Sequence, residues 1–411
     1  MSAPRRAGGG ARRALRGAGA AALVVVAAFV LLEGGSSLVL FVRDLAAGDG
    51  ARPLARLRHT RYDPDLGWAH VPNVHVPDLY GPGAGLRTNG QGCRAARDFA
   101  REVPPGRLRV VCSGDSFTLG YGVGDADPWC AGLEAIDARL ETVNMGQGGY
   151  GVDQSYLWYR RDGRALDHDV HVFAFILDDF RRMQERSFLG YPKPVLALRG
   201  GGLVAENTPV PRRPFWAGFV PPLARAAASL RAAELARGAR PAARGGDDAE
   251  VTALPEADPA TFALVAKVVE DLAAWNREKA SELVLVFLPT PADYRRRAAD
   301  PWRRLAAREA AARGVAYLDL VEALRALPAP ALEPLFIRPG ALAFRAAAGH
   351  PTPEGHGWLA RRVYEAIAAR PRVAERLRRL PAPAGAAPAS ARAPAEETRT
   401  APAAGVSVPR R

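Results

Sequence analysis

The chain has 411 residues, of which 48% are hydrophobic and 24% charged, so it can bury a substantial core and is neither a disordered nor a fibrous protein. The formal net charge is +13 at pH 7. The arginines are scattered through alanine-rich stretches and form no single patch with interleaved aromatic residues, which argues against nucleic-acid binding.

The N-terminal segment has the pattern of a membrane anchor. A basic segment, residues 1–16, precedes an apolar run at residues 17–42 that is long enough to span a bilayer. Five arginines before this run, and only Arg43 soon after it, predict a cytoplasmic N-terminus and a periplasmic or extracellular main domain. The alternative is a cleaved signal peptide whose apolar stretch ends near Leu32, because Glu33 interrupts the run.

Short apolar runs alternate with longer amphipathic ones between residues 107 and 372, which predicts one α/β domain. Two runs, at residues 170–177 and 283–288, are almost continuously apolar, as in parallel strands that are buried on both faces. The expected strands are residues 108–112, 142–145, 170–177, 283–288 and 315–318. Asp258-Pro259 and Thr352-Pro353 have the pattern of helix starts, and the helix after Thr352 is expected to close the domain.

Three further segments lack this pattern. Residues 43–106 are rich in Pro, Gly and Asn and are expected to form an extended lead-in that packs on the domain. Residues 186–256 are interpreted as an insertion that contains a helix at 223–235 and an exposed loop at 238–248. Residues 381–411 are mostly Ala and Pro and are expected to be a disordered tail.

The strongest local signal is the turn Gly114-Asp115-Ser116-Phe117, which follows an apolar strand. Such a turn places Ser116 at the carboxyl edge of a parallel sheet, where α/β proteins bind ligands, although a serine there is equally suited to cap the next helix. A glycine cluster at residues 146–151 follows the next strand and frees backbone N–H groups to face the same edge, as an oxyanion hole requires. The rival interpretation of that cluster is a phosphate-binding loop, but it matches neither the dinucleotide nor the Walker pattern.

His350 is the best candidate for a general base among the seven histidines, because it lies in a loop just before the last predicted helix. His356 is expected to cap or pack in that helix, and His168 and His171 flank a strand.

In this combination the chain resembles the GDSL or SGNH hydrolase superfamily over about residues 88–367. The resemblance implies a flavodoxin-like three-layer α/β/α sandwich with a mostly parallel sheet. It also implies that Ser116 is the nucleophile and His350 the base, and that the N–H groups of Ser116 and Gly149 form the oxyanion hole, with no cofactor and no metal.

Two departures from the family pattern weaken this assignment. Asp178 stands where the family usually has an asparagine that donates to the oxyanion, and an ionised carboxylate cannot donate. Ala347 stands where the family has the aspartate that orients the histidine. Asp179 and Asp293 are the nearest substitutes for that carboxylate.

The sequence therefore predicts an exported serine esterase or O-acyltransferase that acts on O-acyl esters, in particular acetyl esters of envelope or secreted glycans. The alternative is a catalytically impaired domain that binds a glycan or an assembly partner. A third hypothesis is a metal or phosphate enzyme that uses Asp115, Asp178 and Asp179 as oxygen ligands.

Overall fold

The computed structural model describes residues 9–47, 59–189, 191–211 and 258–381. The predicted helix at 223–235, the loop at 238–248 and the tail at 382–411 lie outside the described residues. All five predicted strands are present and form one parallel sheet: β5 (Leu108–Gly114), β6 (Leu140–Gly146), β7 (Val170–Phe175), β12 (Glu282–Phe287) and β13 (Ala316–Asp319).

The order of the strands in the sheet is β13-β12-β7-β5-β6. Numbered along the chain, this is the order 2-1-3-4-5 of flavodoxin-like folds, so the predicted fold class is confirmed. The strand order reverses between β5 and β7, and ligands of open α/β sheets bind beyond the carboxyl ends of the strands at such a point. Ser116 and Asp178 follow directly from the ends of these two strands.

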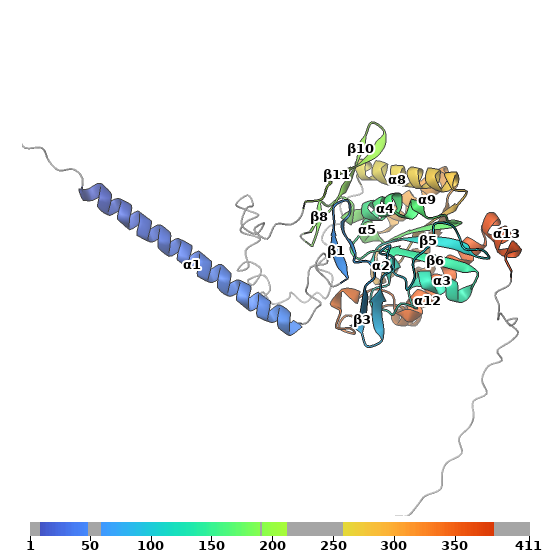
Figure 1. Cartoon of the computed structure of the whole chain (residues 1–411), viewed down its shortest axis with the longest axis horizontal. Coiled ribbons are helices and arrows are strands. Elements are labelled where there is room, and N and C mark those ends of the chain that lie inside the picture. Colours follow the sequence, from blue (N-terminus) through green and yellow to red (C-terminus); the bar gives the residue numbers. More distant parts are fainter. Residues whose placement is uncertain (1–8, 48–58, 190, 212–257, 382–411) are drawn as a thin grey trace, which may run out of the picture.

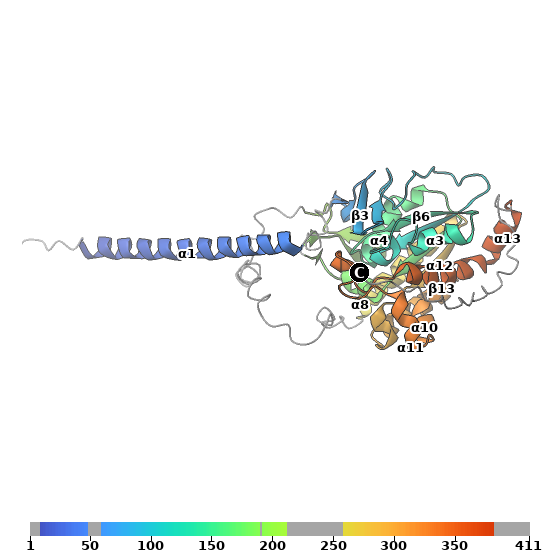
Figure 2. The same ribbon diagram turned by 90° about the horizontal axis from the view of Figure 1, so that it is seen from below.

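Helices cover both faces of the sheet (Figure 1). One face packs against α4 (Val152–Arg161), α8 (Pro259–Glu278) and α9 (Asp300–Ala312). The other face packs against α3 (Trp129–Ile136), α12 (Pro353–Ala368) and α13 (Pro371–Arg379), and Figure 2 shows α12 near α3 and α13. The short helices are α2 (Ser116–Leu119), α5 (Leu177–Arg182), α10 (Leu320–Arg325) and α11 (Ala329–Leu332).

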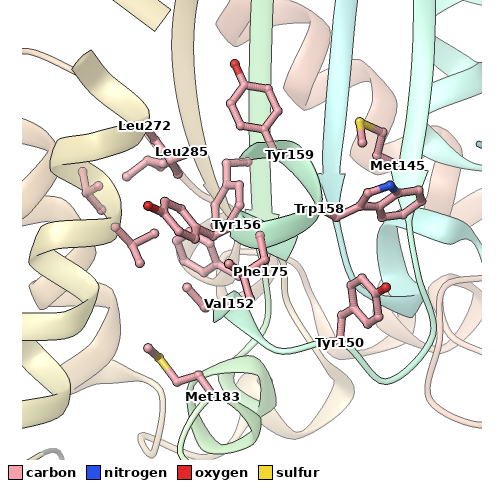
Figure 3. Packing of buried hydrophobic residues seen from close by; sticks show 14 of the residues in the cluster. Met145, Tyr150, Val152, Tyr156, Trp158, Tyr159, Phe175, Met183, Leu272 and Leu285 are labelled. Atoms are coloured by element: carbon pink, nitrogen blue, oxygen red, sulfur yellow. The ribbon is translucent and has the colours of Figure 1, made fainter. Parts of the chain in front are cut away.

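The core on the α4 side is rich in aromatic residues. Tyr156 and Tyr159 of α4 lie among the side chains of α8 and the sheet, and Figure 3 shows them beside Leu272 and Leu285. Tyr156 also stacks on Trp275 with ring centroids 5.2 Å apart. These contacts bury one face of α4 and thereby fix the loop before it, which carries the glycine cluster.

The two predicted helix starts are correct. The carboxylate of Asp258 accepts from Thr261 N at 2.7 Å at the start of α8, and the hydroxyl of Thr352 accepts from Gly355 N at 3.0 Å at the start of α12. The expectation that α12 closes the domain is wrong, because α13 follows it and buries Val373 and Leu377 in the same core.

The lead-in is more regular than predicted, since it contains two antiparallel hairpins. They are β1 (Thr60–Asp63) with β2 (Gly67–His70), and β3 (His75–Gly81) with β4 (Ala84–Arg87). The described part of the insertion also forms two hairpins: β8 (Ser187–Phe188) with β9 (Tyr191–Pro192), and β10 (Val195–Arg199) with β11 (Gly202–Glu206).

The N-terminal helix α1 (Gly9–Ala47) contains one segment, Arg16–Ser36, that is long and apolar enough to cross a membrane. Its apolar side chains are not covered by the rest of the described chain; Leu23, for example, is 71% exposed. Figure 1 shows α1 apart from the sheet and its helices.

Candidate active site

Ser116 is the first residue of α2 and is buried. The helix cap is Asp115, whose carboxylate accepts from Phe117 N at 2.9 Å, so the sequence alternative in which Ser116 is the cap does not hold. The Ser116 hydroxyl therefore caps no helix, and its Oγ lies 3.4 Å from Asp115 Oδ2. The backbone of α2 packs directly against Gly146 at the end of β6. A Cβ on Gly146 would lie 2.1 Å from Leu119 N of α2, so this contact holds the helix in place.

His350 contacts this serine. Its Nε2 lies 2.7 Å from Ser116 Oγ, across a separation of 234 residues in the sequence. Two backbone hydrogen bonds to Ile337 hold the loop that carries His350. Gly349 N donates to Ile337 O, and Ile337 N donates to His350 O, each at 2.8 Å. The histidine therefore approaches the sheet edge from a braced loop.

The two backbone N–H groups proposed for the oxyanion hole are available. Ser116 N, in the first turn of α2, and Gly149 N donate no hydrogen bond to another residue in the described ranges. Gly149 has φ +77°, which favours glycine. Its loop is held at the sheet edge because Gln147 N donates to Gly114 O at 3.2 Å and Trp68 Nε1 donates to Gly148 O at 2.9 Å.

Asp178 is the second residue of α5, and its side chain is 45% exposed. Its ion-pair partner is Arg181, at 3.4 Å. It makes no hydrogen bond to Ser116 or His350 among the described contacts. This side chain is near the site but offers a carboxylate where the family pattern has an amide donor.

A buried ionic network lies directly behind the nucleophile. Arg182 Nη1 of α5 donates to Asp179 at 2.8 Å, to Asp115 at 3.3 Å and to the carbonyl of Tyr150 at 3.2 Å. Burial raises the pKa of Asp115 and of Asp179, while Arg182 opposes the rise in both. The one guanidinium thus joins the ends of β5, β6 and β7, and the sequence reasoning did not single it out.

The structure gives His350 neither of the two carboxylates suggested from the sequence. Asp179 accepts from Ile176 N at 3.0 Å and pairs with Arg182, and Asp293 accepts from Thr290 N at 2.8 Å to cap a short 3-10 turn. His350 Nδ1 is buried and has no hydrogen-bond partner among the described residues. Both carboxylates therefore serve as caps of their own segments.

Burial is the main cause that lowers the pKa of His350 to about 4, and the positive charge of Arg182 acts in the same direction. The carbonyls of Ala348 and Ala347 oppose this shift without completing a hydrogen bond to Nδ1. The imidazole is consequently neutral at pH 7, as a base that accepts the serine proton must be.

The other histidines considered in the sequence have structural contacts. His171 Nε2 lies 2.9 Å from Ser113 Oγ within the sheet, His168 Nε2 lies 3.0 Å from Tyr159 Oη, and His356 Nδ1 accepts from Trp129 N at 3.1 Å. The part of the chain that the structure describes holds no group of three or more His, Cys, Asp or Glu side chains that could bind a metal ion. The positive charge that lies between the carboxylates of Asp115 and Asp179 is the guanidinium of Arg182.

Several solved structures are similar to this chain. A lipolytic protein of the G-D-S-L family from Desulfitobacterium hafniense is 14% identical with a TM-score of 0.37, and the alignment covers 64% of this chain and 100% of that one. A lipase/acylhydrolase from Enterococcus faecalis is 14% identical with a TM-score of 0.36, with 64% and 96% covered.

A variant of an acetylxylan esterase from Geobacillus stearothermophilus is 15% identical with a TM-score of 0.34, with 64% and 94% covered. No family model and no curated protein matches the sequence. The first of these structures is of the superfamily that the sequence motifs resemble.

Proposed function

We propose that this protein is a serine esterase or O-acyltransferase that uses Ser116 as nucleophile and His350 as base. The observation that carries the proposal is the contact of 2.7 Å between His350 Nε2 and Ser116 Oγ at the carboxyl edge of the sheet. A nucleophile within hydrogen-bond reach of a neutral imidazole is the arrangement that acyl transfer through a covalent intermediate requires.

In the proposed reaction, Ser116 Oγ attacks the carbonyl carbon of an ester while its proton passes to His350 Nε2. The N–H groups of Ser116 and Gly149 stabilise the negative charge that develops on the carbonyl oxygen. Collapse of the resulting tetrahedral intermediate breaks the ester C–O bond, and the leaving alkoxide takes the proton from His350. Water, or a sugar hydroxyl, then gives its proton to His350 and attacks the acyl-serine. The bond between the acyl carbon and Ser116 Oγ breaks, Ser116 Oγ takes the proton back from His350, and the acyl group leaves as the acid or the new ester.

The substrate that we propose is an O-acyl ester of an envelope or secreted glycan, with acetyl as the leading acyl group. The acetylxylan esterase among the similar structures suggests a carbohydrate ester. The single apolar helix α1 suggests that the domain is held at a membrane and works outside the cytoplasm. Cleavage of α1 as a signal peptide is the alternative.

The departures at Asp178 and Ala347 favour a second candidate function, a catalytically impaired domain that binds a glycan or a partner. Removal of the orienting aspartate from a catalytic triad costs about 10⁴ in rate in other serine hydrolases. A chain that has neither this carboxylate nor the oxyanion amide can retain the fold for binding alone.

One labelling experiment separates the two functions. The full-length protein, purified in detergent, is incubated with a fluorophosphonate, which reacts covalently with activated serines, beside the Ser116→Ala variant. We expect label on the wild type only. Failure of the wild type to react between pH 5 and 9, with the fold intact by circular dichroism, would sink the esterase proposal and leave the binding function.

A further inference from the structure

The imidazole of His350 packs against two aromatic rings. The ring centroids of Phe117 and His350 are 4.4 Å apart at an interplanar angle of 33°, and those of Tyr121 and His350 are 5.3 Å apart at 36°. Phe117 and Tyr121 are 5% and 3% exposed. We call these two residues the aromatic pair.

The aromatic pair belongs to the same turn of chain as the nucleophile. Phe117 directly follows Ser116 in α2, and Tyr121 N donates to Ser116 O at 3.1 Å. Tyr121 is held in turn by Phe344, whose ring meets it edge-on with centroids 5.1 Å apart. The segment that carries Ser116 therefore also carries the two rings against which His350 packs.

Apolar packing occupies the place where the family pattern has the orienting carboxylate. Ala347 is fully buried and lies against Gly122, where an added Cβ would come within 2.9 Å of the Ala347 Cβ. His350 Nδ1, which such a carboxylate would bind, has no hydrogen-bond partner among the described residues. The carbonyls of Ala347 and Ala348 act on the ring but complete no hydrogen bond to Nδ1, so packing contacts are left to orient the imidazole.

We propose that the aromatic pair, Phe117 and Tyr121, positions His350 in place of the missing carboxylate. This inference rests on the proposed Ser116/His350 chemistry. Rings packed at these distances restrict rotation of the imidazole and keep Nε2 directed at Ser116 Oγ. Aromatic faces also attract the imidazolium that forms when the serine proton is transferred, which the carboxylate would otherwise do.

The ring of Tyr121, and not its hydroxyl, positions the imidazole of His350. Tyr121 Oη is buried against Gly148 and has no hydrogen-bond partner within the described chain, so its removal breaks no described hydrogen bond. The charged and titratable groups that act on His350 or respond to it are Arg182 of α5 and His356 of α12, and Asp115 lies beside Ser116. Tyr121→Phe and Tyr121→Leu both leave these three residues in place and both remove the hydroxyl, so the comparison between the two variants isolates the ring.

The experiment compares the rate of fluorophosphonate labelling of the full-length protein in detergent with that of three variants. Tyr121→Phe keeps the ring and is expected to react within about twofold of the wild type. Tyr121→Leu removes the ring and is expected to react about tenfold or more slowly across pH 5–8, because loss of alignment lowers the reactivity of the pair. Phe344→Leu removes a ring from the same aromatic cluster without touching His350 and is expected to react within about threefold of the wild type.

The proposal is overturned if Tyr121→Leu reacts as fast as Phe344→Leu, or if Tyr121→Phe is as slow as Tyr121→Leu. Should Tyr121→Leu fail to fold, Phe117→Leu is measured in its place against the same control, with the same expectation.

A second readout does not depend on activity and so separates this inference from the proposed function. If the wild type takes no label, the proposed function fails, and the aromatic pair is tested by NMR of 13C-labelled histidine. The His350 ring signal is expected to carry a ring-current shift that persists in Tyr121→Phe and is reduced in Tyr121→Leu, where only the ring of Phe117 remains. An unchanged signal in Tyr121→Leu would overturn the inference.

Discussion

The protonation state of His350 decides the pH range in which the proposed site can work. Burial is the main cause that lowers its pKa from 6.5 to about 4. The neutral form, which accepts the serine proton, is present above this pKa and is lost as the pH falls through it. Because the same burial makes the imidazole a weak base, reactivity is expected to be low as well as broad in pH.

We therefore expect the labelling rate of the wild type to be flat from about pH 6 to 8 and to fall only toward pH 4. An unperturbed histidine would give an inflection near pH 6.5. The measurement is the second-order rate constant of fluorophosphonate labelling across pH 4–8, with circular dichroism at each pH as the control for unfolding. An inflection near pH 6.5 would contradict the buried environment described for His350.

Asp178 is the second residue that is expected to limit the reactivity of the proposed site, because its carboxylate cannot donate to an oxyanion. Substitution Asp178→Asn removes a negative charge near a developing oxyanion and supplies an amide donor, and a single oxyanion donor is worth about 10²–10³ in rate in a preorganised site. Because Asp178 is partly exposed, we expect a smaller gain of about tenfold in the labelling rate. Glu185→Gln is the matched control, since it neutralises another carboxylate that pairs with Arg181. Equal effects of the two substitutions would show that only charge, and not the donor, matters.

At the scale of single elements, α5 couples the three strand ends through Arg182. Its guanidinium is the charge partner of two carboxylates, Asp115 and Asp179, whose side chains are 0% and 2% exposed. Breaking a buried ion pair by removing one partner leaves an uncompensated charge and costs about 3–5 kcal/mol. An exposed pair is worth about 0–1 kcal/mol.

Substitution Arg182→Met is accordingly expected to lower the free energy of unfolding by about 3 kcal/mol or more at pH 7. Arg181→Met on the same helix removes pairs to the partly exposed Asp178 and Glu185 and is expected to cost less than about 1 kcal/mol. Chemical denaturation followed by tryptophan fluorescence measures both. Similar losses for the two variants would mean that the network behind Ser116 adds nothing beyond an exposed pair.

The elements differ in how well the sequence predicts them. The central strands β7 and β12 are predicted correctly because strands buried on both faces are almost continuous apolar runs. The helix α13 is missed because its nine residues carry only two buried side chains, Val373 and Leu377, among several arginines. The hairpins of the lead-in are missed because their strands β1, β2 and β4 are four residues long and offer too short a periodic signal.

At the scale of the whole molecule, the apolar helix α1 bears on where the α/β domain is located. A retained anchor predicts that the full chain, 43.8 kDa, stays with membranes after alkaline extraction and that its domain is open to protease from outside the cytoplasm. Intact-mass measurement of the membrane fraction is the second check. A mature chain that begins shortly after Leu32 and washes off the membrane would instead indicate a cleaved signal peptide.

The sequence by itself determined the parts of this protein that depend on neighbouring residues. The apolar runs of the strands, the caps at Asp258 and Thr352, and the turn that carries Ser116 are local patterns, because strand burial and helix capping act within a few residues. The order of the motifs was also sufficient for the resemblance that implies the flavodoxin-like sheet.

The tertiary structure alone decided which distant groups meet. His350 reaches Ser116 across 234 residues, Arg182 joins Asp115 to Asp179, and the rings of Phe117 and Tyr121 meet the imidazole. Asp179 and Asp293 were plausible partners for His350 by position, yet each caps its own segment. The physical reason is that contacts between loops at a sheet edge depend on strand order and on the packing of two helix layers, which no local pattern records.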